Sequence, residues 1–197
     1  MMNASFRING RILETERLIL RPFREEDLDD FYAYASIPGV GERAGWHHHR
    51  DRDESRRILT FFMDGDKDWA VFLRENGRVI GSLGVDEYDT ALLPELSPYR
   101  GRAIGYVLGK DYWGRGLATE AVKAVTQYLY TESGLDFLTL TYYDFNTQSK
   151  RVSEKCGFRP YRKVTISTQM GTRENGVLNL LLNPSGKLDI AFPEKVL

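Results

Sequence analysis

The feature that most constrains this chain is residues 105–133, where an apolar run is followed by a glycine turn and then by an amphipathic helical pattern. Tyr106 to Leu108 is typical of a short buried strand, and apolar residues then recur at three- and four-residue spacing, as on one helix face. Gly114 and Gly116 lie between them. Because glycine lacks a Cβ, the backbone can turn sharply there and approach a ligand, while unpaired N–H groups at the helix start point at the loop. The stretch therefore predicts an anion site suited to phosphates.

Two glycines can also form a strand-to-helix turn that has no binding role. Longer segments are therefore needed to decide whether this loop binds a ligand. Two known phosphate loops are excluded. Thr119 stands where G-x-G-x-x-G requires its third glycine, and the loop contains no Gly-Lys-Ser/Thr.

Four segments in order resemble the Gcn5-related N-acetyltransferases (GNAT), and in particular their RimJ/RimL-like branch, which acetylates protein N-termini and small amines. YWGRGLATEA is similar to the branch's acetyl-CoA loop, and Gly116 and Ala118 fill the last two defined positions of the family pattern Gln/Arg-x-x-Gly-x-Gly/Ala. Trp113 occupies the Gln/Arg position, which departs from the general pattern. The second cofactor segment, the first strand and the acceptor-side loop are matched by residues 146–158, 13–21 and 45–46.

The resemblance implies a single α/β (α+β) domain over residues 1–197, with a mixed, mostly antiparallel sheet of about six to seven strands, a splayed V between the cofactor strands and about four helices. Local patterns predict helices, hairpins and one further strand within it. These are helices at 23–35, 53–62 and from 146 on, a hairpin of 69–73 and 79–85 turning at Asn76-Gly77, a strand at 137–145, and a terminal hairpin turning at Asn175-Gly176. Residues 92–102 are expected to be irregular and exposed, and the tail from 184 to 197 is expected to be irregular.

The resemblance further implies that acetyl-CoA, the cosubstrate, lies along the first cofactor strand and its loop, with Arg115 adding positive charge and Asn146 and Ser149 positioning the pantetheine arm. The cofactor-binding residues implied are Tyr106, Val107, Leu108, Gly114, Arg115, Gly116, Leu117, Ala118, Thr119, Asn146 and Ser149.

Attack of an amine on a thioester needs a neutral amine, a stabilised oxyanion and a proton for the leaving thiolate. Many relatives supply that proton from a Tyr seven residues after the Asn; here Ser153 stands there, as a serine does in part of the branch, and it is the predicted acid. Many branch members carry a Glu just before Ile/Leu-Gly-Tyr, where this chain has Ala103. Glu87 is therefore the predicted base, with Asp86, one of the histidines at 47–49 or a water chain as alternatives.

The acceptor side is expected to include Trp46 and His49, although Trp46 could equally fill the core. Three adjacent histidines at 47–49 suggest a metal site, but adjacent residues rarely converge on one ion and no cysteine or clear carboxylate spacing completes a tetrahedral set. No metal is predicted.

Composition and charge limit the classes of partner that the protein is expected to bind. Lys and Arg total 27 against 28 Asp and Glu, a net charge of −1 without a dense basic run, which argues against nucleic acid and anionic membranes. Cys156 is the single cysteine, so no intrachain disulfide can form, and the polar N-terminal stretch predicts neither a signal peptide nor a membrane span. We expect a cytoplasmic protein; the family resemblance allows a homodimer.

The sequence thus predicts direct acetyl transfer from acetyl-CoA to a primary amine, foremost the α-amine of a protein or peptide N-terminus. Two alternatives stay open at this point. One is a small-molecule amine or antibiotic acetyltransferase, which the acidic run at 86–89 would suit. The other is a module that binds acetyl-CoA with little turnover, as the residues at 103 and 113 suggest.

Overall fold

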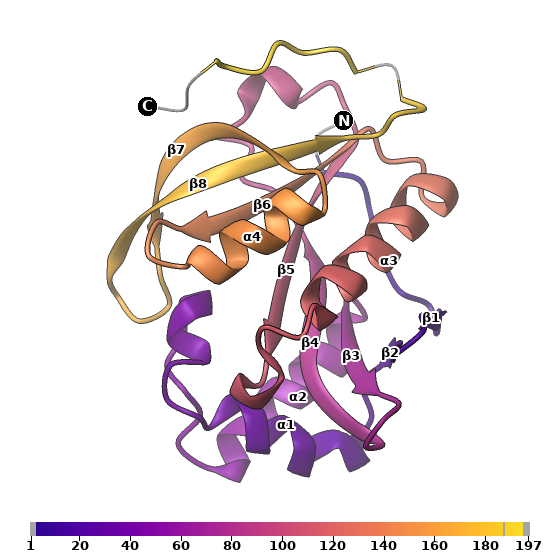
Figure 1. The fold of residues 1–197 in the computed structure, drawn as a ribbon, viewed down its shortest axis with the longest axis vertical. Coiled ribbons are helices and arrows are strands. Elements are labelled where there is room, and N and C mark those ends of the chain that lie inside the picture. The colour runs from indigo at the N-terminus through magenta and orange to yellow at the C-terminus, as the bar shows by residue number, and fades with distance from the viewer. Residues whose placement is uncertain (1–2, 187, 195–197) are drawn as a thin grey trace. The chain divides into compact units, whose positions relative to one another are not determined.

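The computed structural model describes residues 3–186 and 188–194, and in them an eight-stranded mixed sheet with four α-helices (Figure 1). The strand order is β1-β2-β3-β4-β5-β6-β8-β7. The strands are β1 (Leu13–Glu14), β2 (Leu18–Pro22), β3 (Asp68–Leu73), β4 (Arg78–Asp86), β5 (Gly101–Leu108), β6 (Phe137–Tyr143), β7 (Arg159–Ser167) and β8 (Arg173–Leu182). The helices are α1 (Leu28–Ala35), α2 (Arg52–Gly65), α3 (Leu117–Glu132) and α4 (Thr147–Lys155), with short 3₁₀ turns η1 (Glu25–Asp27), η2 (Gly41–Ala44), η3 (Pro94–Leu96) and η4 (Lys110–Tyr112).

This architecture confirms the predicted fold class, although the expected number of strands is slightly low. The additional strand is β1, which has two residues and is too short to show an alternating pattern. The chain forms two compact units: unit 1 comprises Met1–Phe6, Val85–Gly105 and Val125–Leu197, and unit 2 comprises Arg7–Gly84 and Tyr106–Ala124.

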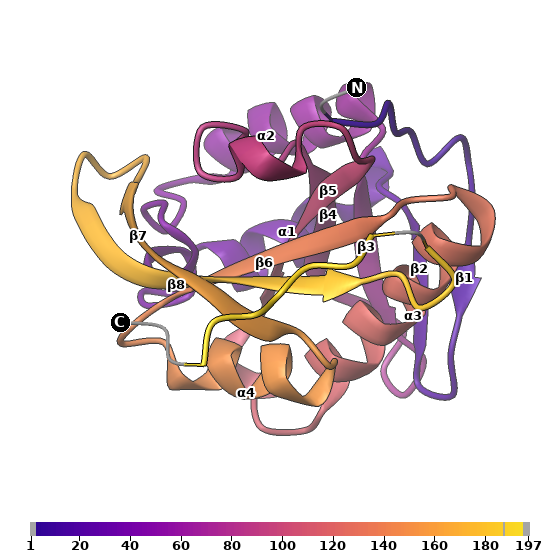
Figure 2. The same ribbon diagram turned by 90° about the horizontal axis from the view of Figure 1, so that it is seen from above.

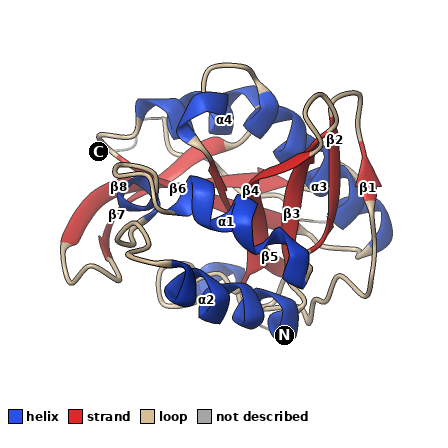
Figure 3. Cartoon of the chain, turned by 90° about the horizontal axis from the view of Figure 1, so that it is seen from below, coloured by secondary structure: helices blue, strands red, loops and turns tan. Residues whose placement is uncertain are grey.

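In unit 2, α1 and α2 lie side by side (Figure 3), and their apolar faces meet through aromatic rings. The Phe31 ring stands edge-on to that of Phe23 and close to that of Phe62, with centroids 5.6 Å away in both cases. Asp51 caps α2, its carboxylate accepting from the Glu54 N–H at 2.8 Å. The chain thus runs from β2 through these two helices to β3 and β4, and the three strands are antiparallel neighbours in the sheet.

In unit 1, β8 lies between β6 and β7 and is antiparallel to both, and β7 and β8 make a long curved hairpin (Figure 2). Its core contains Phe137 and Leu180, both fully buried, and the ring of Tyr88 meets that of Phe137 at a centroid distance of 5.0 Å. The described part of the tail has no helix or strand, as expected, yet Leu188 is buried in the same cluster. The tail is therefore irregular but packed.

Two local predictions were wrong. The terminal hairpin does not turn at Asn175-Gly176, because Gly176 lies inside β8, paired with Tyr143 and Val164. A Cβ on Gly176 would lie 2.4 Å from the Tyr142 carbonyl oxygen, so this glycine serves close strand approach rather than a turn. The turn falls instead between Ser167 and Arg173. β5 begins at Gly101, inside the stretch expected to be irregular and exposed, and Leu93 and Leu96 of that stretch are fully buried.

The parallel ladder between β5 and β6 is short. Among the described residues it has three pairs and ends at Ala103↔Thr139. β6 nevertheless continues to pair with β8 as far as Tyr143↔Gly176, and β5 continues to Leu108. The two strands therefore stop pairing midway, which is the feature that a splayed V between cofactor strands requires.

Candidate active site

The loop between β5 and α3 has the backbone that an anion site needs. Gly114 and Gly116 have φ of 75° and 80°, a region that favours glycine, and both are exposed. The Gly116 carbonyl accepts the first helical hydrogen bond of α3, from the Glu120 N–H at 3.1 Å. The helical hydrogen bonds of α3 therefore begin at Gly116, and the positive end of this 16-residue helix lies at the loop.

Trp113 anchors the start of this loop rather than offering a polar side chain to a ligand. Its indole N–H donates to the Leu108 carbonyl at 2.8 Å, and its ring packs against the aromatic core of unit 2. The Arg43 guanidinium lies 5.3 Å from the indole centroid. Because Trp113 replaces the Gln or Arg of the family pattern, its indole holds the start of the loop. The Leu108 carbonyl is occupied by the hydrogen bond from Trp113.

The turn between β3 and β4 supports the loop from another side. The Arg115 guanidinium pairs with the Glu75 carboxylate and lies 6.0 Å from the ring centroid of Tyr112. The Asn76 side-chain N–H donates to the Tyr112 hydroxyl at 3.0 Å. Arg115 remains 40% exposed, so its charge stays near the loop although it already has a carboxylate partner.

Sequence reasoning missed a polar cluster at the start of α3. The Glu120 carboxylate accepts from the Thr15 hydroxyl at 2.6 Å, the Arg17 backbone N–H at 3.0 Å and the Arg17 Nε at 2.7 Å. Burial raises the pKa of Glu120, but these donors outweigh it and hold the pKa below its ordinary value. Thr15, Arg17 and Glu120 all lie in the segments that resemble the family, yet nothing in either segment alone pairs them.

The second cofactor segment forms the start of α4 in unit 1. The Asn146 side-chain oxygen accepts from the Ser149 N–H at 3.2 Å, so Asn146 caps this helix. Ser153 follows in the same helix and is fully buried. Its hydroxyl has no hydrogen-bond partner among the described residues. A buried hydroxyl without a partner is costly in a purely structural position, which suits a group that acts on a bound ligand.

Glu87 lies in unit 1, directly after the last residue of β4, and its side chain is 74% exposed. Its nearest basic partner is Arg102, whose guanidinium lies 3.9 Å away and is itself buried. Asp89 is exposed and accepts from the Ala91 N–H at 2.9 Å. These carboxylates lie on loops and do not form an enclosed acidic pocket, and Ala103 lies partly buried beside the core of the unit.

The acceptor-side loop of unit 2 brings Trp46 and His49 together, with ring centroids 5.1 Å apart. His49 is buried, and its Nδ1 lies 2.7 Å from the Ser55 hydroxyl oxygen. Burial lowers the pKa of His49, although the Glu54 charge opposes this, so the ring is neutral at pH 7. Trp46 is partly buried against the same core, and a Cβ on Gly41 would lie 2.2 Å from its ring. His48 and His49 therefore have separate partners, Glu42 and Ser55.

Glu42 organises this loop. Its carboxylate accepts from the Gly39 N–H at 2.7 Å and the His48 N–H at 3.1 Å, and the His48 Nδ1 lies 2.8 Å away. Burial raises the pKa of Glu42, but the hydrogen bonds from His48 and the backbone prevail and lower it to about 2.

A folded pKa below the ordinary value of 4.5 means that ionised Glu42 stabilises the fold above that pH and that this stability is lost as the pH falls towards 2. Because the side chain is 31% exposed, we expect roughly 1 to 2 kcal/mol rather than the full shift. Glu42→Gln should lose that amount at pH 7 and show a weaker fall in urea-unfolding free energy between pH 5 and pH 3. Glu26→Gln, at an exposed pair with Arg24, is the control and should behave as the unaltered protein. An unchanged acid profile in Glu42→Gln would contradict this assignment.

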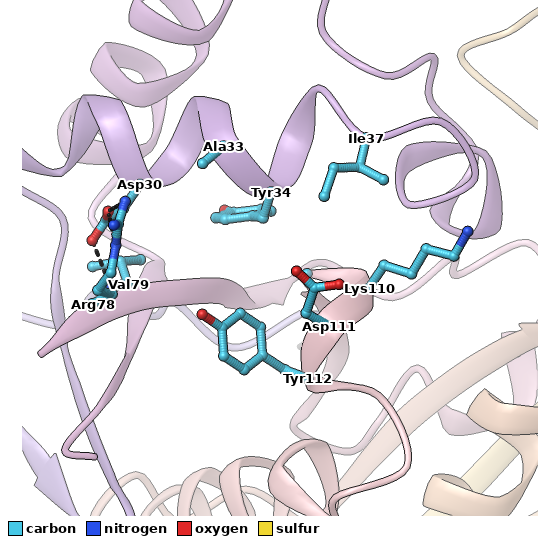
Figure 4. A pocket seen from close by; sticks show the side chains of 10 residues that line it. Asp30, Ala33, Tyr34, Ile37, Arg78, Val79, Lys110, Asp111 and Tyr112 are labelled. Atoms are coloured by element: carbon cyan, nitrogen blue, oxygen red, sulfur yellow. Dashed lines mark hydrogen bonds and ion pairs between the residues drawn. The ribbon is translucent and has the colours of Figure 1, made fainter. Parts of the chain in front are cut away.

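Figure 4 shows a pocket of about 90 Å³ in unit 2, bounded by α1, the start of β4 and residues 109–112. Asp30 and Arg78 form an ion pair at its edge, with a nitrogen–oxygen distance of 2.5 Å. None of the predicted site residues lines it. Within the described residues there is also no group of three or more His, Cys, Asp or Glu that could hold a metal ion, and no helix there is long and apolar enough to cross a membrane.

These features define a protein with an exposed glycine loop at the start of a long helix, on a mixed sheet whose parallel pair is short. Residues 17–159 match the family described as the Acetyltransferase (GNAT) domain, and the chain therefore belongs to the GNAT acetyltransferases. The match runs through both units. The protein is thus an N-acetyltransferase of a family that uses acetyl-CoA, and the exposed glycines of its loop leave room for that cosubstrate's phosphates.

Individual relatives agree with this. An uncharacterized N-acetyltransferase of Bacillus licheniformis, p20, is 29% identical over 153 residues, covering 75% of this chain and 82% of the relative. The GNAT-family acetyltransferase of Bacillus anthracis has a TM-score of 0.76 at 23% identity, covering 88% of this chain and 99% of that one. The ribosomal-protein-S5-alanine acetyltransferase of Vibrio fischeri has a TM-score of 0.69 at 17% identity, covering 90% and 100%.

Proposed function

We propose that the acceptor is the α-amine of a protein or peptide N-terminus and that the chain belongs with the RimJ/RimL-like branch. The observation that carries the cosubstrate half of this proposal is the loop with positive φ at Gly114 and Gly116, at the start of α3. The acceptor half is supported by the resemblance of YWGRGLATEA and of residues 146–158 to that branch, and by the fold shared with the Vibrio fischeri enzyme.

The acid–base chemistry also favours an α-amine. An α-amine has a pKa of about 7.7 to 8.0, so a sizeable fraction is neutral near pH 7.5, whereas a lysine amine near 10.4 is almost wholly protonated. The chain has Ala103 where many branch members carry a Glu, and Glu87 is largely exposed. A site with so weak a base suits an acceptor that is already partly neutral. Glu87 or a water chain then takes the remaining proton as the amine attacks.

We assign the other roles as follows. Backbone groups of Tyr106 and Val107 hold the pantetheine arm, with Leu108 contributing its N–H, and amides from Gly114 to Thr119 hold the pyrophosphate. Asn146 and Ser149 position the arm. Ser153 protonates the leaving thiolate. Trp46 and neutral His49 form the wall on the acceptor side.

The acceptor class is tested by mass spectrometry of three acceptors incubated with the protein and acetyl-CoA. They are a peptide with free N-terminal Ala or Ser, the same peptide with a blocked N-terminus and one lysine, and a polyamine. We expect acetylation of the free N-terminal peptide alone. Acetylation of the polyamine alone would instead establish a small-molecule acetyltransferase.

A further inference from the structure

Arg17, in the turn between β1 and β2, contacts the cofactor loop at a single backbone atom. Its Nη1 donates to the Arg115 carbonyl at 2.9 Å, while its Nε and Nη2 reach one Glu120 carboxylate oxygen at 2.7 and 2.6 Å. All three residues lie in unit 2. The guanidinium thus joins the loop to the first turn of α3.

The contact fixes the orientation of one peptide plane. The Arg115 carbonyl and the Gly116 N–H belong to the same peptide bond, and the structure has no cis peptide among its described residues. In a trans peptide these two groups point in opposite directions. Because Arg17 holds the carbonyl on its own side, the Gly116 N–H is directed away from Arg17. With φ of 80° at Gly116, a flip of this plane would otherwise be easy.

Glu120 in turn fixes the arginine. Arg17 is 43% exposed, and a long exposed side chain samples many rotamers unless it is held. Glu120 is 18% exposed and is itself held by the Thr15 hydroxyl and the Arg17 backbone N–H. The planar guanidinium can bind Glu120 with one edge and the Arg115 carbonyl with another, which an ammonium group cannot do.

We propose that Thr15, Arg17 and Glu120 form a clamp that directs the Gly116 N–H towards the pyrophosphate of acetyl-CoA. This inference rests on the proposed binding of the pyrophosphate at this loop. Arg17 is a positioning residue: it acts through the peptide plane, and Glu120 acts through Arg17.

The test compares cosubstrates with and without the pyrophosphate. In Arg17→Met the plane is free to turn, and calorimetry should show CoA binding weakened about tenfold, the loss expected for one charge-assisted hydrogen bond. Acetyl-pantetheine has no pyrophosphate, so kcat/KM with this thioester should stay within about twofold of the unaltered protein. Arg56→Met, which breaks an exposed ion pair with Asp53 in α2, is the matched control and should leave CoA binding unchanged.

Glu120→Gln separates positioning from simple attraction, because the Arg17 guanidinium is also a positive charge near Gly116. The clamp predicts weaker CoA binding in Glu120→Gln, and a double variant no worse than Arg17→Met alone. If Arg17 acts only by its charge, removing the neighbouring carboxylate should leave binding equal or tighter, and that result would overturn the clamp.

Arg17→Lys keeps the charge without the fork and should lose an intermediate amount, which provides a second variant should Arg17→Met fail to fold. Equal loss with CoA and acetyl-pantetheine would show a general structural defect and refute the clamp. Failure of the unaltered protein to bind CoA would instead remove the proposed cosubstrate site, and the clamp with it.

Discussion

Gly116→Trp should weaken acetyl-CoA binding by about 100-fold or more in calorimetry, since several charge-assisted hydrogen bonds are lost together. An L-residue at φ of 80° is strained, and a Cβ on Gly116 would lie 3.6 Å from the Arg17 Nη2, so a large side chain must displace either Arg17 or the loop backbone that is proposed to approach the phosphates. Strain alone would cost about 1 to 2 kcal/mol of stability and no affinity.

Gly10→Trp is the matched control for that strain. Gly10 has φ of 74°, is exposed, and has no atom within 4 Å of a Cβ built on it. We expect a similar loss of unfolding free energy in urea with unchanged acetyl-CoA affinity. Micromolar binding retained in Gly116→Trp would return the loop to a purely structural turn.

Ser153→Ala should reduce kcat about 100-fold while acetyl-CoA affinity stays unchanged, because general acid catalysis contributes on that order. Stability should not fall, and could only rise, since the variant removes a fully buried hydroxyl that has no partner among the described residues. Lower activity together with equal or higher unfolding temperature is a combination that a packing role does not produce.

Thr126→Val is the control for this prediction. The Thr126 hydroxyl in α3 is also buried and unpartnered in the described part of the chain, so its removal should again spare stability, but kcat should not change. A normal kcat in Ser153→Ala would contradict the assignment of Ser153 as the acid and would leave proton transfer to water.

Local patterns predicted the parts of the fold that short segments determine. The β5 end, the glycine loop and α3 follow from an apolar run, two glycines and a helical period, all within one stretch of the chain. Gly176 shows the limit of that reasoning: beside Asn175 it has the composition of a turn, but its role is set by the Tyr142 backbone of another strand.

The same limit explains what was missed at the site. Glu120 and Arg17 are 103 residues apart, and each is plausible alone as an exposed charge on a helix or turn. Their pairing depends on β2 lying near the start of α3, which no local pattern contains. Conversely, Trp113 could be flagged as a departure from the family pattern, but only the contact of its indole with the Leu108 carbonyl shows what it does instead.

The most direct test of the central claim is release of free thiol from acetyl-CoA by the unaltered protein, measured with and without a peptide that has a free N-terminal Ala or Ser. An acetyltransferase predicts thiol release that depends on the peptide, saturates with both reactants and matches the acetyl groups found on the peptide. Binding of acetyl-CoA without peptide-dependent or amine-dependent thiol release would contradict it and indicate a module that binds acetyl-CoA without turnover.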